Sequence, residues 1–198
     1  MPDGITLGFD TSAAHCAAAL LSGDRVLAQR IEPMTRGQAE RLFPILEDLL
    51  AEAGLAWSDL AVIGVGIGPG NFTGIRIAVA GARGLALSLG IPAIGVSVTE
   101  AAALDLPRPC RIVLPTRGEQ VIWQDFDGED TDRTAPQQGS PDALPPGPAP
   151  AQPIVPLPVA IARIAASRQG TPHPRPAPIY LRPADAAPAR DRGPVILS

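Results

Sequence analysis

The chain has 198 residues, of which 45% are apolar, and a formal net charge of −4. That length and apolar content suit one or two domains with a hydrophobic core, and the acidic balance excludes a basic surface that grips nucleic acid unaided. All sixteen basic residues are arginine, which excludes chemistry that needs a lysine, such as a Schiff base or a P-loop.

Three apolar runs separated by short turns open the chain. They lie at residues 5–9, 15–21 and 25–31, and predict an antiparallel meander. A helix is expected next, over about 36–53, because its leucines recur at helical spacing. Thr35 and Gln38 fit a capping box, and Pro44 predicts either a kink or the start of the regular helix.

A strand at 60–66, a glycine-rich loop and a helix at 73–89 follow. Glycine permits close approach, and a helix N-terminus attracts anions, so this loop is a candidate anion cradle; a simple tight turn is the alternative. The helix carries a stripe of small residues, which indicates close packing against its own sheet or against another molecule. The stripe comprises Gly74, Ala78, Gly81, Ala82 and Leu85.

The rest of the chain gives weaker signals. We expect a strand at 93–96, a helix at 98–104, strands at 110–114 and 119–126, a loop or linker over the Pro-rich segment 128–158, a helix at 159–168, an extended segment at 178–183 and a loose tail at 184–198. The predicted division is therefore an N-terminal domain, 1–104, and a shortened, degenerate C-terminal domain, 105–198.

The strand and helix order βββαβα, with Asp10-Thr11-Ser12 ending the first strand, resembles half of the α/β fold of actin-like ATPases. That ribonuclease H-like fold includes hexokinase and the heat-shock ATPases. Three segments sharpen the match: Gly8 to Ser12, Arg36 to Pro44, and Gly68-Pro69-Gly70-Asn71-Phe72-Thr73-Gly74-Ile75-Arg76-Ile77. They resemble the "DTS" strand, the "R-x-H-S-E-x-L-L-P" helix and the "GPGSFTGLRIG" signature of the TsaB family, also called YeaZ.

The resemblance implies a non-catalytic subunit for threonylcarbamoyladenosine synthesis at adenosine 37 of transfer RNA. TsaD, the catalytic paralogue, carries a His-x-x-x-His metal pair after the strand that follows the glycine-rich helix. Residues 94–103 contain no histidine here, and the whole chain has only His15 and His173. We therefore expect no metal site and no catalysis by this chain, which binds and activates a TsaD-like threonylcarbamoyltransferase.

The resemblance also implies partners and contact residues. The partners are a TsaD-like paralogue, a TsaE-like ATPase and, for the chain alone, a second copy; transfer RNA is reached only through the complex, and no membrane is involved. Partner contacts are expected at Gln38, Arg41, Leu42, Ile45, Leu46, Arg76, Ala78, Gly81 and Arg83. Vestigial or interface contacts to nucleotide or phosphate are expected at Asp10, Thr11, Ser12, Gly68, Gly70, Asn71 and Thr73. The chain has no cofactor of its own, and ATP or ADP with Mg²⁺ is expected only at a complex interface.

Two other functions stay open. An independent ATPase or kinase would use Asp10, Thr11 and the glycine-rich loop, and nucleotide-dependent stabilisation would reveal it. A glycoprotease-type metallopeptidase is disfavoured by the shortage of histidines. Two cysteines form no disulfide framework, the start of the chain has no basic leader, and no apolar stretch is expected to span a bilayer. We therefore expect a cytoplasmic location.

Overall fold

The computed structural model describes residues 4–116, 118–128 and 134–181, which form two sheets. The first sheet has the order β3-β2-β1-β4-β5 and the second β8-β7-β6-β9. The strands are β1 (Ile5–Asp10), β2 (His15–Ser22), β3 (Arg25–Pro33), β4 (Leu60–Gly66), β5 (Ala93–Val96), β6 (Cys110–Pro115), β7 (Val121–Phe126), β8 (Gln137–Gly139) and β9 (Pro150–Ala151). The helices are α1 (Gln38–Ala53), α2 (Phe72–Leu89), α3 (Val98–Ala102) and α4 (Leu157–Arg168).

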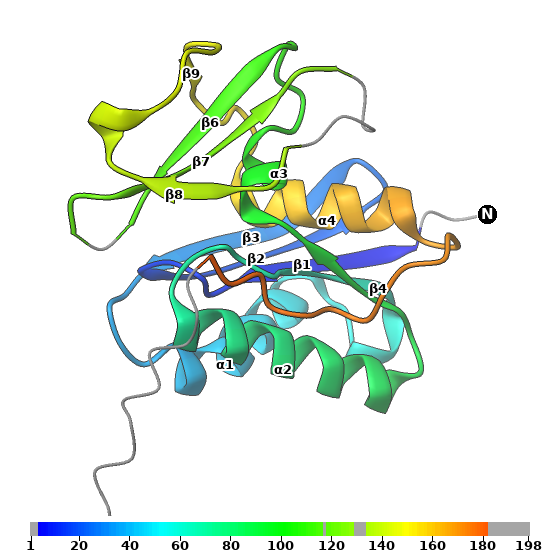
Figure 1. Cartoon of the computed structure of the whole chain (residues 1–198). Coiled ribbons are helices and arrows are strands. Elements are labelled where there is room, and N and C mark those ends of the chain that lie inside the picture. Colours follow the sequence, from blue (N-terminus) through cyan, green and yellow to red (C-terminus); the bar gives the residue numbers. More distant parts are fainter. Residues whose placement is uncertain (1–3, 117, 129–133, 182–198) are drawn as a thin grey trace, which may run out of the picture.

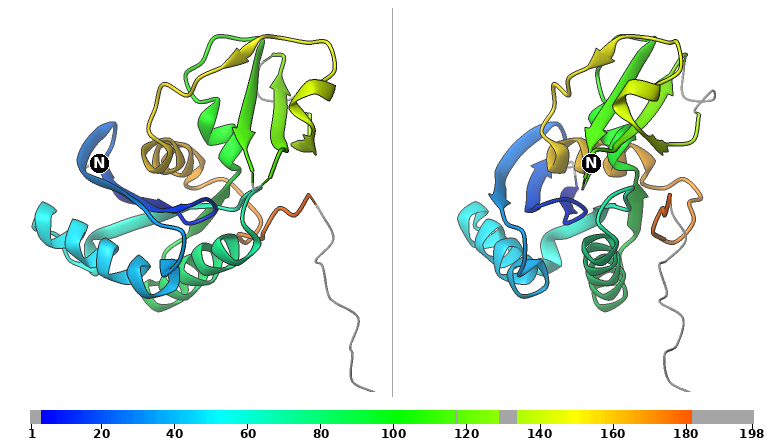
Figure 2. Two further views of the ribbon diagram at one scale, coloured as in Figure 1. Left: turned by 90° about the vertical axis from the view of Figure 1, so that its left-hand side faces the viewer. Right: turned by 60° about the vertical axis from the view of Figure 1, so that its left-hand side comes forward.

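Helices cover both faces of the first sheet (Figure 1). Helices α1 and α2 lie on one face, and α4 lies on the other, between the first sheet and the second (Figure 2). The strands β1, β2 and β3 form the expected antiparallel meander, whereas β4 and β5 run parallel to β1. This topology is that of the predicted actin-like α/β fold.

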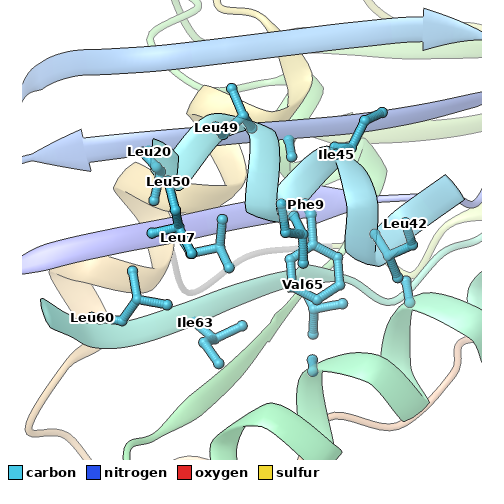
Figure 3. Close-up of a cluster of buried hydrophobic side chains, with 14 of the residues drawn as sticks. Leu7, Phe9, Leu20, Leu42, Ile45, Leu49, Leu50, Leu60, Ile63 and Val65 are labelled. Atoms are coloured by element: carbon cyan, nitrogen blue, oxygen red, sulfur yellow. The ribbon is translucent and has the colours of Figure 1, made fainter. Parts of the chain in front are cut away.

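The core beneath α1 explains why this part of the chain folds as it does. Leu42, Ile45, Leu46 and Leu49 recur at helical spacing and are fully or almost fully buried. They pack on Leu7, Phe9 and Leu20 of the sheet (Figure 3). Burial of each such side chain contributes at most about 1.5–3 kcal/mol, so this layer fixes the position of α1 on the sheet.

The start of α1 differs from the prediction. The helix begins at Gln38, after Gly37 in a left-handed conformation (φ 89°), and no side chain caps it. Thr35 therefore lies outside the helix, and the predicted capping box is wrong. Pro44 lies inside a continuous helix. The hydrogen bond that Pro44 cannot make is offset by the burial of the leucines around it.

The Pro-rich segment is more regular than predicted. Strands β8 and β9 and a 3₁₀ turn (Pro141–Ala143) lie within residues 128–158, so the prediction of a loop is corrected. Both strands are short and pair with β7 and β6, which supply hydrogen bonds that the local sequence does not reveal. Such tertiary pairing overrides composition.

Helix α4 links the second half of the chain to the first. It packs on β1, β2 and β4, where Gly8 and Gly64 provide room: a Cβ at Gly8 would lie 2.4 Å from the carbonyl oxygen of Pro158. The boundary after residue 104 stays a prediction. Residues 178–181 follow as an extended segment, and the predicted tail at 184–198 lies outside the described residues.

One helix corrects the expectation about apolar stretches. Over its 18 residues α2 has a mean hydropathy of 1.3, so it is long and apolar enough to cross a membrane by length and composition alone. In the fold, Ile75, Ala78, Val79 and Ala82 of this helix are buried. These four residues thus belong to the core of the domain, whereas Leu87 of the same helix is exposed.

Candidate functional site

A buried carboxylate marks the end of β1. Asp10 is fully buried, and its Oδ2 accepts hydrogen bonds from the backbone N–H and the hydroxyl of Ser12, each at 2.9 Å. The Nε2 of His15 lies 2.7 Å from the same oxygen. The short turn between β1 and β2 brings His15 there, a contact that the sequence analysis missed. A hairpin prediction with a four-residue turn could have suggested it.

The turn after β1 packs directly into the glycine-rich loop after β4. The hydroxyl of Thr11 donates to the carbonyl oxygen of Gly74 at 2.6 Å, and the N–H of Asn71 donates to the carbonyl oxygen of Ser12 at 2.6 Å. A Cβ at Gly74 would lie only 1.9 Å from the carbonyl oxygen of Thr11, and one at Gly70 2.4 Å from that of Ser12. The glycines are therefore required for close packing between the two loops.

This packing shows how the two loops lie against each other. The carbonyl oxygens of Thr11 and Ser12 approach Gly74 and Gly70 of the glycine-rich loop. The second oxygen of Asp10, Oδ1, is buried without a hydrogen-bond partner and lies 2.0 Å from where a Cβ of Gly66 would be. The predicted contact of Asp10 with nucleotide, phosphate or Mg²⁺ stays a prediction.

The first turn of α2 contacts the end of the described chain. Asn71 caps the helix, accepting a hydrogen bond from the N–H of Thr73 at 3.3 Å. The guanidinium of Arg76 lies 3.6 Å from the ring centre of Phe72, and its Nε donates to the Tyr180 hydroxyl at 2.9 Å. The N–H of Ile179 donates to the carbonyl oxygen of Ile67 at 2.8 Å. No local signal predicts this contact between distant segments.

The expected nucleotide residues are thus brought together, with Gly70 and Thr73 exposed and Asp10, Thr11, Ser12 and Gly68 buried. Gly68 has a left-handed φ of 90° and is buried, with the carbonyl oxygen of Ile179 3.1 Å from where its Cβ would lie. Thr73 is exposed on the first turn of α2. Gly68 thus lies against Ile179, whereas the N–H of Thr73 donates its hydrogen bond to the side chain of Asn71.

The expected partner residues divide into two groups. Gln38, Leu42, Ile45, Leu46 and Ala78 are buried within this chain, so their prediction as surface contacts is corrected. Periodicity identified the apolar side of each helix, which faces the chain's own core rather than a partner. Gly81 is partly buried, and the side chain of Leu42 lies 3.3 Å from where its Cβ would be.

Other side chains of these helices reach the surface. Arg76 and Arg83 are exposed, as predicted partner contacts require. Arg41 instead forms a bidentate ion pair with Glu32, with distances of 2.7 and 2.8 Å. The sequence analysis missed Phe43 and Leu87, which are 41% and 87% exposed. Their large apolar side chains at positions outside the core periodicity could have identified them.

The two histidines do not meet. His15 contacts Asp10, whereas Nδ1 of His173 lies 2.8 Å from the carbonyl oxygen of Thr171. In the described part of the chain, no three His, Cys, Asp or Glu residues gather as a metal site would require.

The pKa values of three groups are shifted at the start of β2 and at the edge of the sheet. Burial, with a smaller contribution from Glu32, raises the pKa of the Cys16 thiol to about 11. The hydrogen bonds that Arg41 donates to Glu32 lower the pKa of Glu32 and raise the pKa of Arg41 itself. Cys16 is thus an unreactive thiol, and Glu32 and Arg41 tie β3 to α1.

Comparison with known proteins identifies a family model, a sequence relative and a solved structure that are similar to this chain. Residues 25–137 match the model of the family TsaD, tRNA N6-adenosine threonylcarbamoyltransferase. The chain is 38% identical over 91 residues to the tRNA threonylcarbamoyladenosine biosynthesis protein TsaB of Escherichia coli, covering 46% of this chain and 39% of that protein. A crystal structure of a Pseudomonas aeruginosa protein similar to YeaZ superposes with a TM-score of 0.71 at 26% identity, covering 90% of this chain and all of that one.

The chain belongs to the TsaB/YeaZ family. The sequence resemblance rests on the first hundred residues. The structural similarity extends further, because the P. aeruginosa structure matches 90% of this chain. An uncharacterised Mycobacterium leprae protein is 31% identical over 215 residues, covering 98% of this chain but 59% of its own length. The chain thus spans less than two thirds of both sequence relatives.

Proposed function

We propose that this TsaB/YeaZ family member is an accessory subunit for threonylcarbamoyladenosine synthesis in transfer RNA. It binds a TsaD-like threonylcarbamoyltransferase and holds that partner in its active conformation. The observation that carries the proposal is the match to both TsaB and the TsaD family model in a chain with two separated histidines. Transfer RNA then reaches this subunit only through the complex, in the cytoplasm, where a TsaE-like ATPase is a further partner.

The exposed side of α1 and α2 is the proposed contact surface. Phe43 of α1 lies over Gly81 of α2, and Arg83 and Leu87 project outward from α2. An apolar centre beside an arginine is typical of protein interfaces, in which aromatic and arginine side chains dominate the binding energy. Leu87, at 87%, is the most exposed large apolar side chain of the described residues and supports the proposal most directly.

Replacement of Leu87 tests this surface. We expect Leu87→Glu to weaken the complex with a TsaD-like paralogue by at least tenfold, because a charge would be buried in an apolar contact. Light scattering after size exclusion, with calorimetry for affinity, measures the effect. Ser58→Glu, at an exposed position outside both helices, is the control. Equal affinity of Leu87→Glu and the unaltered chain would contradict the proposed surface.

The activating role needs a separate measurement. Threonylcarbamoylation by the TsaD-like paralogue is expected to require this chain and to fall with Leu87→Glu in parallel with complex formation. Full activity of the paralogue alone would contradict the accessory function.

Nucleotide is proposed to bind only at an interface of the complex. The enclosed Asp10 and the packed loops support this proposal over an independent ATPase. ATP with Mg²⁺ should leave the melting temperature of the isolated chain unchanged, and a concentration-dependent rise would favour the independent ATPase instead.

A further inference from the structure

A proline-rich strap connects the end of α4 to the start of α2. We use this name for residues 172–181, in which no helix or strand forms. Figure 1 shows the strap in orange, between these two helices. A Cβ at Gly95 of β5 would lie 3.4 Å from the Cα of Pro176, and the N–H of Ile179 donates to the carbonyl oxygen of Ile67, just after β4. The strap is therefore attached to both strands near their carboxyl ends.

Alternating prolines make the strap stiff. Residues 172, 174, 176 and 178 are all proline. Proline fixes its own φ at about −65° and restricts the preceding residue to extended conformations. Pro176 is also buried. The place of Tyr180, two residues after the last of these prolines, is therefore set by the fold as well as by its own contacts.

Tyr180 holds an arginine of α2 in one orientation. The guanidinium of Arg76 lies 3.6 Å from the ring centre of Phe72 and 5.7 Å from that of Tyr180, and the two ring centres are 4.8 Å apart. The Nε of Arg76 donates to the Tyr180 hydroxyl at 2.9 Å. Contact with a ring face and a directed hydrogen bond together fix both the position and the plane of the guanidinium.

The other two nitrogens of Arg76 remain available. Within the residues that the structure describes, the bond from Nε is the only hydrogen bond of this side chain, and Arg76 forms no ion pair there. A guanidinium binds a carboxylate through two parallel N–H donors, and Nη1 and Nη2 form one such pair. Arg76 thus presents an oriented and unoccupied edge to a carboxylate.

Arg76 also lies on the side of α2 that belongs to the proposed contact surface. Successive helical residues are about 100° apart, so residues 76, 83 and 87 fall within roughly 40° of one another around the helix. All three side chains are exposed. Arg76 and Arg83 are the only charged residues of α2. This side of the helix is therefore complementary to a partner surface that carries acidic side chains.

We propose that Tyr180 is a positioning residue for Arg76, and that the guanidinium so held binds a carboxylate of the TsaD-like paralogue through Nη1 and Nη2. This inference rests on the proposed function and specifies one contact within it. Tyr180 acts by ordering the arginine before the partner arrives. The loss of side-chain freedom is then already complete when the two proteins associate, and the complex is tighter for that reason.

A double-mutant cycle tests the positioning role. Tyr180→Phe removes only the hydroxyl group and should raise the dissociation constant of the complex about threefold to tenfold in calorimetry without RNA. Arg76→Ala should raise it about tenfold, and Tyr180→Phe should then add nothing further. A purely structural role of Tyr180 would give the same loss in both backgrounds. Ala177→Ser, at an exposed position of the strap, is the matched control and should bind as the unaltered chain does.

A second measurement needs no partner. Tyr180 is the only tyrosine of the chain, so incorporation of 3-fluorotyrosine gives a single fluorine resonance. In the isolated protein this resonance should shift in Arg76→Ala, because the guanidinium leaves the ring and the hydroxyl. It should stay in place in Arg83→Ala, which removes an exposed arginine from the same side of α2. A resonance that Arg76→Ala leaves unmoved would contradict the positioning contact.

The binding results separate this inference from the proposed function. A complex that forms normally and is unaffected by Tyr180→Phe would overturn the inference and leave the proposed function intact. An equal loss from Tyr180→Phe in the presence and absence of Arg76 would assign Tyr180 a contact of its own. Sensitivity to Arg76→Ala only when transfer RNA is present would assign the guanidinium to a phosphate instead of a carboxylate. Failure of the unaltered chain to bind the paralogue would overturn both proposals, with the fluorine resonance still reporting on the contact of Tyr180 with Arg76.

Discussion

Single glycines determine how closely the two loops of the candidate site approach. Gly66, Gly70 and Gly74 each lie where a Cβ would collide with Asp10, Ser12 or Thr11. Gly84, in the same helix as Gly74, has no atom within 4 Å of such a Cβ. The sequence shows both as interior helix glycines, and only the structure separates the one that is required from the one that is not.

These two glycines give a matched pair of variants. Gly74→Ala should reduce the free energy of unfolding by about 3 kcal/mol, because the new methyl group displaces the turn at Thr11 and breaks its hydrogen bonds. Gly84→Ala should instead raise it by roughly 1 kcal/mol through helix propensity. Urea denaturation measures both. Equal effects of the two substitutions would show that the loops do not pack as described.

At the scale of elements, burial decides which side of a helix is available. The periodicity of α1 predicted its apolar side correctly, but that side belongs to the core, and Phe43 is the exposed apolar residue of this helix. Likewise, β8 and β9 exist because β7 and β6 offer them partners. Propensity cannot identify such strands, since a three-residue strand has no stability of its own.

The second sheet depends on a buried ion pair. The side chain of Arg111 is 4% exposed and makes two hydrogen bonds to Asp125, at 2.5 and 2.7 Å, and a third to the carbonyl oxygen of Pro145 at 2.7 Å. The pKa of Arg111 is raised by these bonds to Asp125. The pair thus joins β6 to β7 and to the loop before β9.

Removal of this arginine should be costly. Arg111→Met should destabilise the chain by about 3–5 kcal/mol, because Asp125 loses its compensating charge in a largely buried position. Arg30→Met, which removes exposed ion pairs with Asp48 and Glu52, should cost about 1 kcal/mol or less. Chemical denaturation of both variants makes the comparison, and a similar cost for each would contradict the buried pair.

At the scale of the whole molecule, the absence of lysine leaves few side chains that titrate at alkaline pH. The ionisation of one buried thiol can therefore be followed by its effect on stability. Arginine remains charged, so few groups ionise between pH 9 and 11. The pKa of Cys16 is raised from 9.0 to about 11 in the folded state. Below pH 9 both folded and unfolded states hold the thiol proton, and above it the unfolded state releases the proton first.

Stability should therefore fall as the pH rises from about 9 to about 11. The loss attributable to Cys16 is roughly 2–3 kcal/mol when complete. Urea denaturation across this pH range measures it, and Cys16→Ala should flatten the profile whatever its effect at pH 8. An identical pH slope in the alanine variant would assign the titration to another group.

The sequence by itself determined the order of strands and helices through residue 104, because each element there has strong periodicity and clear turn residues. It also determined the family, because the glycine-rich signature and the Asp10 turn are contiguous motifs. The tertiary structure decided what those motifs do. The enclosure of Asp10, the contact of Tyr180 with Arg76, and the burial of Leu42 and Ala78 each depend on segments that are distant in the chain, and local composition carries no record of such contacts.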